Sequence, residues 1–293
     1  MSQFASSELI LNSDGSVYHL NLLPGQISDI IFLVGDPGRV PRISKHFDKI
    51  DHQVEKREFV SHTGWLKSRR FTAISTGIGT DNIDIVINEL DALANIDLKS
   101  RTVKDSLTSL TFIRLGTSGA LRPQIAPGDI VASSHGIGMD GLLFYYDRNI
   151  DVEGIDLGDK FISYCDEKNI NLPLKPYGAS GDHNLLNDLF SDKTAGITMT
   201  ATGFYGPQSR QLRARISAPG LFDAINEFHF NGFHITNMEM ETAAIYGLAN
   251  ELGHKALSIN AILANRATGV VTNDPSSVVD NMIVEVLERL QQV

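Results

Sequence analysis

The sequence predicts an α/β fold, and two observations lead to that prediction. Apolar, strand-like runs alternate with helix-like segments from about residue 29 to the C-terminus, which is the pattern of a layered α/β fold. In addition, 42% of the residues are hydrophobic and 20% are charged, so the chain can bury a substantial core. No repeat, low-complexity tract or composition shift marks a linker, and we therefore predict a single domain over residues 1–293.

The first half of the chain contains four predicted strands and two predicted helices. Residues 1–28 are expected to be irregular. One helix is predicted from Asp36, as N-cap, and Pro37, as first residue, to about Phe47. The other covers 83–95, where apolar residues recur at three- and four-residue spacing. The strands are predicted in apolar or β-branched runs, at 29–35, 69–75, 109–116 and 128–134.

The second half continues the alternation of strands and helices. Residues 155–192 are expected to be helical in part. The last helix follows a strong start signal, with Asp274 as N-cap and Pro275 at its first position. Strands are predicted at 195–205, 233–237 and 255–266. Helices are predicted at 220–230, 238–253 and 275–292, the second of them apolar nearly all round.

Charge and cysteine content exclude several classes of protein. The net charge of −10 argues against nucleic acid or an anionic membrane surface as the main partner. A single cysteine, Cys165, rules out an intrachain disulfide and a cysteine-based metal cluster. We find neither a signal-peptide pattern nor a membrane-spanning apolar run. The expectation is a cytoplasmic, globular protein.

Three predicted strand ends carry arginine close to glycine or asparagine: Gly35–Arg39, Arg114–Gly119 and Asn265-Arg266. Glycine lets the backbone approach a ligand, and a guanidinium fits phosphate in two-point contact. The first of these turns is equally consistent with a capped helix start and a solvated arginine. Arg114 is more informative, because it interrupts an apolar strand and needs a buried anionic partner. Neither a Walker motif nor G-x-G-x-x-G is present, which argues against a nucleotide cofactor.

Together these motifs resemble a known family. Seven segments occur in the order found in nucleoside phosphorylases of the uridine phosphorylase type: GDPGRV, KREF, STGIGTDN, RLGTSGALRP, FYGPQSR, NMEMETAA and ANR. The resemblance extends from about Tyr18 to the C-terminus and is weakest in 140–195. It implies a three-layer α/β/α fold with a central mixed, partly barrel-like sheet. It also implies that segment 1–28 contributes to the active site of a neighbouring subunit.

The resemblance assigns residues to phosphate and ribose. Phosphate, the co-substrate, is expected at Gly35, Arg39, Arg114 and Thr117, with Arg57 lent by the neighbouring subunit. Without the resemblance, the favoured interpretation of Arg57 is a solvated strand residue. Ribose is expected at three positions: Met240, Glu241 and His19, the histidine again from the neighbour. The alternative for Glu239 and Glu241 is that they decorate a helix N-terminus, where acidic residues are favoured.

The base is expected at the FYGPQSR loop. The resemblance implies that Gln208 and Arg210 hydrogen-bond the uracil edge, while Phe204 packs on the ring. Further base contacts are implied for Ser118, Gly119, Leu263 and Ala264. An amide offers one donor and one acceptor, which complements an imide N–H beside a carbonyl. The catalytic residues are predicted to be Arg39, Arg114, Glu241 and Arg210.

The implied reaction is the reversible phosphorolysis of uridine to uracil and ribose 1-phosphate, with thymidine and deoxyuridine as further candidate substrates. No metal or organic cofactor is expected in catalysis. A structural potassium site in some relatives matches Glu58, Ile78 and Asn82, but the loop sequence there departs from theirs. Borrowed residues imply a homodimer, or a hexamer built from dimers.

Other functions on the same scaffold stay open. They are a purine nucleoside phosphorylase, a hydrolytic nucleosidase and a non-catalytic nucleoside-binding protein. Purine-specific relatives usually place an aspartate after the last central strand, where this chain has Ala264-Asn265-Arg266. Hydrolases typically lack part of the arginine set, and Arg39, Arg57 and Arg114 are all present.

Overall fold

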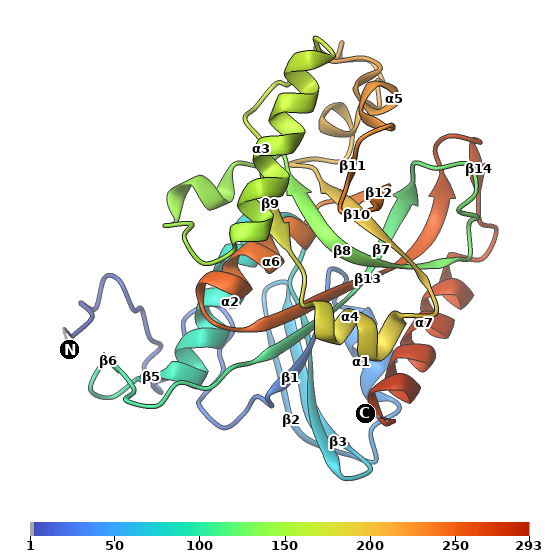
Figure 1. Ribbon diagram of the computed structural model, residues 1–293. Coiled ribbons are helices and arrows are strands. Elements are labelled where there is room, and N and C mark those ends of the chain that lie inside the picture. The colour runs from blue at the N-terminus through green and yellow to red at the C-terminus, as the bar shows by residue number, and fades with distance from the viewer. Residues whose placement is uncertain (1–2, 293) are drawn as a thin grey trace. The chain divides into compact units, whose positions relative to one another are not determined.

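The computed structural model describes residues 3–292, which fold into two compact units (Figure 1). The first unit comprises Met1–Ile113 and Leu252–Lys255, and the second comprises Arg114–Glu251 and Ala256–Val293. Both units combine helices and strands. Within residues 3–292, no helix is both long and apolar enough to span a membrane.

The first unit is built on a four-stranded sheet with the order β1-β4-β3-β2. β1 and β4 are parallel, while β3 is antiparallel to both of its neighbours. Helix α1 packs on β3 and β4, and Phe32, Phe47 and Phe71 stack in the core. The elements of this unit are β1 (Ile30–Val34), α1 (Arg39–Ser44), β2 (Lys49–Lys56), β3 (Phe59–Leu66), β4 (Arg69–Ser75), α2 (Thr80–Asn95), β5 (Ile96–Asp97) and β6 (Thr102–Val103).

The second unit contains a sheet that closes on itself. Its strands follow the order β12-β10-β8-β13-β7, and an additional pairing of β12 with β7 completes a five-stranded barrel. Parallel and antiparallel pairs both occur, and β10 changes register beside Ile197, as curved strands often do. These strands are β7 (Thr111–Ala120), which begins in the first unit, β8 (Ile130–Gly138), β10 (Thr194–Thr200), β12 (Phe233–Glu239) and β13 (Lys255–Asn265).

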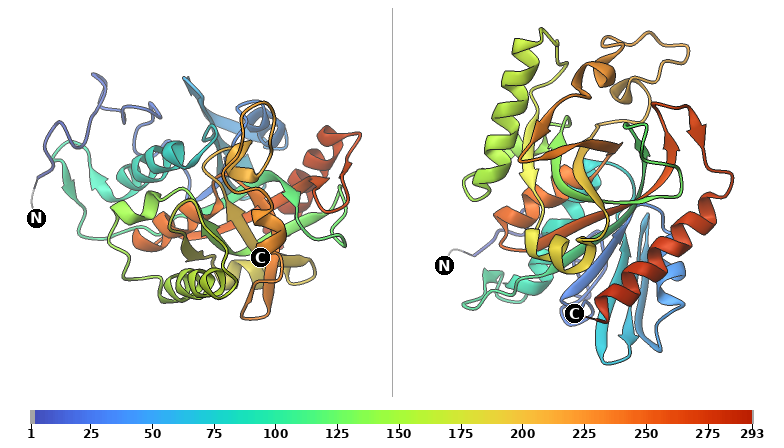
Figure 2. Two further views of the ribbon diagram at one scale, coloured as in Figure 1. Left: turned by 90° about the horizontal axis from the view of Figure 1, so that it is seen from above. Right: turned by 45° about the vertical axis from the view of Figure 1, so that its right-hand side comes forward.

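Helices and short strands surround this barrel. Helices α3 and α6 pack on β8 and β9, and α4 lies against α7 (Figures 1 and 2). Helix α6 is buried on almost every side, which explains why its sequence is apolar nearly all round. The remaining elements are η1 (Leu142–Tyr145), α3 (Val152–Glu167), β9 (Tyr177–Ser180), α4 (His183–Phe190), η2 (Gly206–Gln208), α5 (Leu221–Ile225), β11 (His229–Phe230), α6 (Thr242–Glu251), β14 (Val270–Val271) and α7 (Pro275–Leu290).

The predicted α/β fold with a mixed, partly barrel-like sheet is confirmed. The predicted last helix is also confirmed, and the side chain of its N-cap, Asp274, accepts from Ser277 N–H. Several boundaries were wrong. Asp36 closes a turn by accepting from Gly38 N–H, and the helix begins only at Arg39. The strand predicted over 195–205 ends at Thr200, and the helix predicted over 220–230 ends at Ile225.

Two further differences have clear physical reasons. The hairpin β2–β3 was not predicted, because β2 is an edge strand with mostly polar residues and no apolar run. The helix predicted over 238–253 begins at Thr242, because Met238 and Glu239 continue β12 beside β10. This second change matters for function, since it places Glu239 at the end of a barrel strand.

Candidate active site

A buried cluster of charged side chains lies in the barrel of the second unit. Arg114 on β7 donates from Nη2 to Glu241 Oε2 at 2.6 Å and lies 2.8 Å from Glu239 Oε2. Its other terminal nitrogen donates to Asn260 Oδ1 on β13 at 2.9 Å. The side chains of the three charged residues are at most 7% exposed. The prediction that Arg114 needs a buried anionic partner is thereby confirmed.

Gly116 makes the position of Arg114 possible. A β-carbon at Gly116 would overlap the guanidinium of Arg114, so any larger residue here would displace that guanidinium from the two glutamates. Burial lowers the pKa of Arg114, but the two glutamates outweigh that effect and raise it overall. The arginine is therefore a fixed cation, and two carboxyl groups share it.

Glu239 has a second task at the start of α6. Its carboxylate accepts from the backbone N–H groups of Glu241 and Thr242, and from Thr200 Oγ at 2.8 Å. These contacts occupy Glu239 and hold the first turn of the helix. Glu241 contacts Arg114 from the same turn. Glu239 is therefore occupied by the start of the helix, whereas the predicted ribose residue Glu241 contacts Arg114.

The predicted base loop follows β10 in the same unit. Residues Gly206–Gln208 form a 3-10 turn, with Pro207 in its first positions, and Gln208 becomes buried. Arg210 donates to the Gln208 side-chain oxygen and to Phe204 O, and its guanidinium carbon lies 4.0 Å from the centre of the Phe204 ring. The loop thus brings Phe204, Gln208 and Arg210 together, while Phe204 itself is 52% exposed.

Arg266, at the end of β13, connects this loop to the barrel. It donates to Gln208 O, and a β-carbon placed on Gly119 would lie 3.7 Å from Arg266 Cγ and 3.8 Å from Arg210 Nη2. Burial and the neighbouring Arg266 lower the pKa of Arg210. The Arg210 guanidinium and the aliphatic part of the Arg266 side chain therefore both lie beside Gly119 near the end of β7.

The remaining predicted residues of this unit lie on the same strands or beside them. Ser118 is buried and accepts from Asn237 Nδ2 at 2.9 Å, and Met238 pairs with Gly119 across the sheet. Four others are half-buried or lie at strand ends without a contact that defines their role: Thr117, Met240, Leu263 and Ala264.

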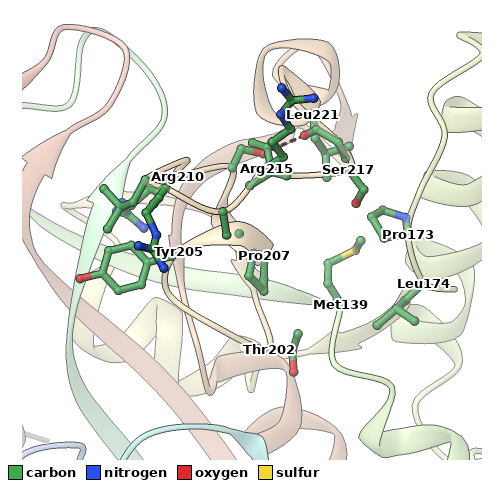
Figure 3. A pocket seen from close by; sticks show the side chains of 17 residues that line it. Met139, Pro173, Leu174, Thr202, Tyr205, Pro207, Arg210, Arg215, Ser217 and Leu221 are labelled. Carbon is green, nitrogen blue, oxygen red and sulfur yellow. Dashed lines mark hydrogen bonds between the residues drawn. The ribbon is translucent and has the colours of Figure 1, made fainter.

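An apolar cavity of about 670 Å³ lies beside the base loop. Figure 3 shows Tyr205 and Arg210 on one side and Met139, Pro173 and Leu174 on the other. Of the predicted base residues, only Arg210 lines it. The cavity therefore lies beside the predicted base loop, and Phe204 and Gln208 of that loop do not line it.

In the first unit, the predicted phosphate turn lies at the ends of two parallel strands. Gly35 follows β1 and Gly77 follows β4, and a β-carbon on Gly35 would lie 3.4 Å from Gly77 O. Arg39 is the first residue of α1 and is 8% exposed. The solvated-arginine alternative for this turn is therefore wrong.

The two residues expected to be lent to a neighbour lie in one cluster of the first unit. His19 Nδ1 lies 2.7 Å from Glu89 Oε1, and its backbone N–H donates to the same carboxylate. The adjacent Tyr18 ring packs on His19 and lies under the guanidinium of Arg57, 5.7 Å from the ring centre. Arg57 is exposed at the tip of the β2–β3 hairpin and has a φ of +56°. That conformation is uncommon outside glycine and is often found at functional positions.

The predicted potassium ligands are partly assembled. Glu58 and Asn82 both lie beside Gly77, where their side-chain atoms would meet a β-carbon on that glycine. The Ile78 side chain is 68% exposed. A carboxylate and an amide oxygen suit a hard cation, so the site remains a prediction on these residues.

Comparisons with known proteins identify the family of this chain. Residues 29–293 match the profile of the phosphorylase superfamily. The chain belongs to the phosphorylase superfamily. The expectation of a pentosyl-transferring enzyme with a nucleoside-phosphorylase-type fold is therefore confirmed.

Individual superfamily relatives carry two kinds of name. The chain is 29% identical to a uridine phosphorylase of Thermococcus kodakarensis, over 92% of this chain and 84% of the relative. It is 25% identical to a DeoD-type purine nucleoside phosphorylase of Shewanella loihica, over 87% and 89%. The solved structure of a Trypanosoma brucei nucleoside phosphorylase with uridine phosphorylase activity superposes with a TM-score of 0.87, at 28% identity over 97% of this chain and all of that one.

Sequence reasoning missed two residues of the second unit. Asn260 holds Arg114, and it interrupts an apolar strand just as Arg114 does, so the same signal marks it. Arg266 was noted at a strand end but received no role, because its contact with Gln208 depends on how the base loop folds.

Proposed function

We propose that this superfamily member catalyses the reversible phosphorolysis of uridine. The observation that carries the proposal is the Arg210 guanidinium, which lies beside Gly119 and donates to the side-chain oxygen of Gln208, while Arg266 donates to the Gln208 backbone carbonyl. An amide and a guanidinium suit an imide ring that becomes anionic as it leaves. The similarity to uridine phosphorylases supports the same assignment.

In the proposed reaction, a phosphate oxygen attacks C1′ of the sugar while the bond from C1′ to N1 of uracil breaks. Arg39, Arg57 and Arg114 balance the phosphate charge, together with Gly35 and Thr117. Glu241 accepts hydrogen bonds from the ribose hydroxyls and stabilises positive charge on the sugar ring, with His19 and Met240 at its sides. Arg210 stabilises the departing uracil anion, so that no strong general acid is required.

The absence of an aspartate after the last central strand supports a pyrimidine over a purine. Purine-specific relatives usually have an aspartate that protonates the leaving base in the stretch that here reads Ala264-Asn265-Arg266. Here the Asn265 amide donates to Arg122 O and Ile125 O at 2.8 and 2.7 Å, and its oxygen accepts from Thr268 N–H. The Asn265 side chain is engaged in these hydrogen bonds with backbone groups, and an amide has no acidic proton to donate. A purine phosphorylase is the second candidate, favoured by the similarity to DeoD-type enzymes.

The substrate assay compares uridine, thymidine, deoxyuridine, inosine and adenosine, each with and without inorganic phosphate, by following release of the free base. We expect uracil from uridine only when phosphate is present. Base release without phosphate would instead indicate a hydrolase. A preference for inosine or adenosine would transfer the assignment to purines, and no turnover of any nucleoside would leave only a binding protein.

We also propose that two subunits share each site, in a cytoplasmic homodimer or a hexamer of such dimers. The support is that His19 and Arg57 lie in one cluster with Tyr18, in which Arg57 is exposed and the other two are half-buried. In a two-fold dimer, equivalent residues of both chains then serve opposite sites.

Mixed dimers test the sharing. His19→Ala and Arg210→Ala should each lower kcat/KM for uridine by about 100-fold, since each removes contacts to the reacting substrate. A dimer of one His19→Ala chain and one Arg210→Ala chain contains one intact site and should regain up to half of wild-type activity. Arg213→Ala, an exposed change in the same loop, is the matched control and should keep full activity. Mixed dimers no more active than their parents would contradict shared sites.

A further inference from the structure

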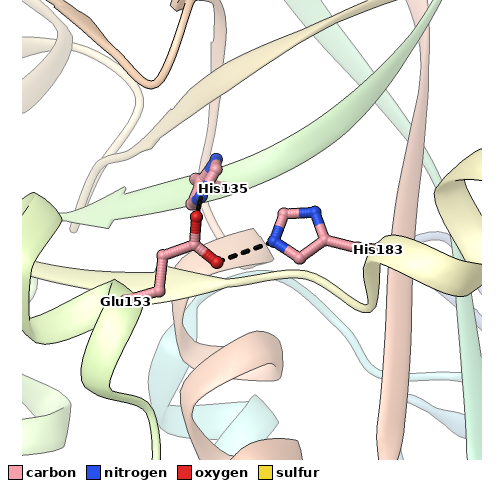
Figure 4. A group of neighbouring side chains, drawn as sticks. All are labelled: His135, Glu153 and His183. Atoms are coloured by element: carbon pink, nitrogen blue, oxygen red, sulfur yellow. Dashed lines mark hydrogen bonds and ion pairs between the residues drawn. The ribbon is translucent and has the colours of Figure 1, made fainter.

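Three side chains that play no part in the proposed reaction converge in the second unit. His135 comes from β8, Glu153 from the first turn of α3 and His183 from the first turn of α4 (Figure 4). Glu153 Oε1 lies 3.2 Å from His135 Nε2, and Glu153 Oε2 lies 2.7 Å from His183 Nε2. One ligand atom from each residue lies within 4.8 Å of the other two.

His135 is the buried member of this group. Its side chain is fully inaccessible to solvent, and its Nε2 has no hydrogen-bond partner among residues 3–292, although it points toward the Glu153 carboxylate. The rings of Phe230 and Phe233 pack against it at 5.3 and 5.7 Å between ring centres. A buried nitrogen in an apolar wall costs free energy unless a partner reaches it.

The carboxylate is held in place by a fourth residue. Asn231 Nδ2 donates to Glu153 Oε1 at 3.0 Å from the Asn231-Gly232 turn of the β11–β12 hairpin. This contact fixes the oxygen that faces His135. Such support by a neighbouring polar group is typical of ligands in metal sites.

We propose that His135, Glu153 and His183 form a metal site for a divalent transition-metal ion of borderline softness, with zinc as the best match. Two imidazole nitrogens and one carboxylate oxygen are a ligand set that zinc takes with an open fourth position. The side chains of His183 and Glu153 are 46% and 34% exposed, so an ion and a water molecule can enter from that side. Because ligands about 2.1 Å from one ion lie no more than about 4.2 Å apart, a small inward rotation of the His183 side chain completes the site.

The ion would tie two helix starts to the barrel. Glu153 and His183 belong to α3 and α4, and His135 belongs to β8, which pairs with β13 and β10. None of the three residues is part of the proposed nucleoside site. The expected role is therefore structural, and zinc binding is independent of the substrate assay.

The test uses the full chain, treated with a chelator and then dialysed, with zinc chloride as the probe. Isothermal titration should give one zinc ion per chain with a dissociation constant below about 1 μM. Because His183 is exposed, His183→Ala should fold normally, and it should weaken zinc at least about 100-fold. Glu153→Gln should do the same. Cobalt(II) should give visible absorption bands of a site with four or five ligands in wild type and lose them in His183→Ala.

A control variant separates this site from adventitious binding. His229 and His234 face each other on the β11–β12 hairpin, with ring centres 5.5 Å apart and both residues exposed. Replacing both by alanine should leave zinc affinity within twofold of wild type. The proposal is overturned if wild type binds no tighter than His183→Ala, or if the double variant abolishes binding. Zinc should also raise the melting temperature of wild type but not that of His183→Ala.

Discussion

Two arginines of the second unit each contact two carboxylates, one pair inside the barrel and the other at the surface. Arg114 lies 2.8 and 2.6 Å from Glu239 and Glu241, all nearly inaccessible to solvent. Arg289 in α7 lies 2.6 Å from Asp192 and 2.7 Å from Glu285, and Asp192 is 59% exposed. The same groups therefore meet at similar distances in two different environments.

The environment decides what each cluster contributes. Removing charges from water costs several kcal/mol per ion, and the attraction between them often does no more than offset that cost. The buried cluster is thus weak evidence for stability and strong evidence for a function that requires fixed charge. The surface cluster forms at little desolvation cost, because its charged groups stay partly in water. It lies where α7 meets the end of α4, and Arg289 also donates to Leu189 O. The comparison teaches that ion-pair geometry alone does not reveal a site; burial does.

The largest effect is expected from Arg114→Met. The change leaves Glu239 and Glu241 buried without their cation, which should lower the free energy of unfolding by about 3–5 kcal/mol. Phosphorolysis should fall by at least about 1000-fold, since the variant also lacks a phosphate contact. Urea unfolding followed by circular dichroism measures the first quantity, and initial rates with uridine and phosphate measure the second.

A double variant separates the two consequences. Adding Glu241→Gln to Arg114→Met removes one of the stranded charges and should recover part of the lost stability. Activity should remain absent, because Glu241 is the carboxylate that we assign to ribose. Arg289→Met is the matched change in the surface cluster. If Arg114→Met lowers the free energy of unfolding no more than Arg289→Met does, burial does not distinguish the two clusters in stability.

The two arginine clusters also differ in how much of each can be predicted from the sequence. A charged residue inside an apolar strand is costly without a partner. The sequence around Arg114 is therefore enough to predict that a buried anion lies beside it. The sequence does not predict which residues supply that anion. Glu239 and Glu241 lie more than 120 residues away and contact Arg114 only because β12 pairs with β7. Arg289 shows the reverse: its contact with Glu285 follows from helical spacing, but its contact with Asp192 does not.

The least predictable part of the site is the base loop. The sequence identifies Phe204, Gln208 and Arg210 as candidates, yet it predicts that the preceding strand continues to Tyr205, whereas β10 ends at Thr200. The buried position of Gln208 and its contact with Arg266 result from the 3-10 turn at Gly206–Gln208. Short turns depend on tertiary contacts as much as on local sequence, and their boundaries are therefore the weakest sequence inference.

A smaller effect is expected from Arg289→Met. Exposed ion pairs contribute little, because water and salt screen them. The melting temperature should fall by no more than about 3 °C, and phosphorolysis should be unchanged. Differential scanning calorimetry and the uridine assay measure the two quantities. A loss of activity would mean that α7 is coupled to the active site, and the surface cluster would then no longer be a neutral reference for the buried one.

The pH dependence of this small effect identifies its source. The hydrogen bonds from Arg289 lower the pKa of Asp192 to about 2, whereas a free aspartate titrates near pH 4. Between these values the unfolded chain binds more protons than the folded chain at this group, so the stability that the pair contributes is complete above about pH 4 and disappears toward pH 2. The difference in urea midpoint between wild type and Arg289→Met should therefore shrink between pH 5 and pH 3, and 1 M salt at pH 5 should also reduce it. A difference that stays constant through this window would show that Arg289 acts through packing on Phe190, 4.8 Å from its ring centre, instead of through charge.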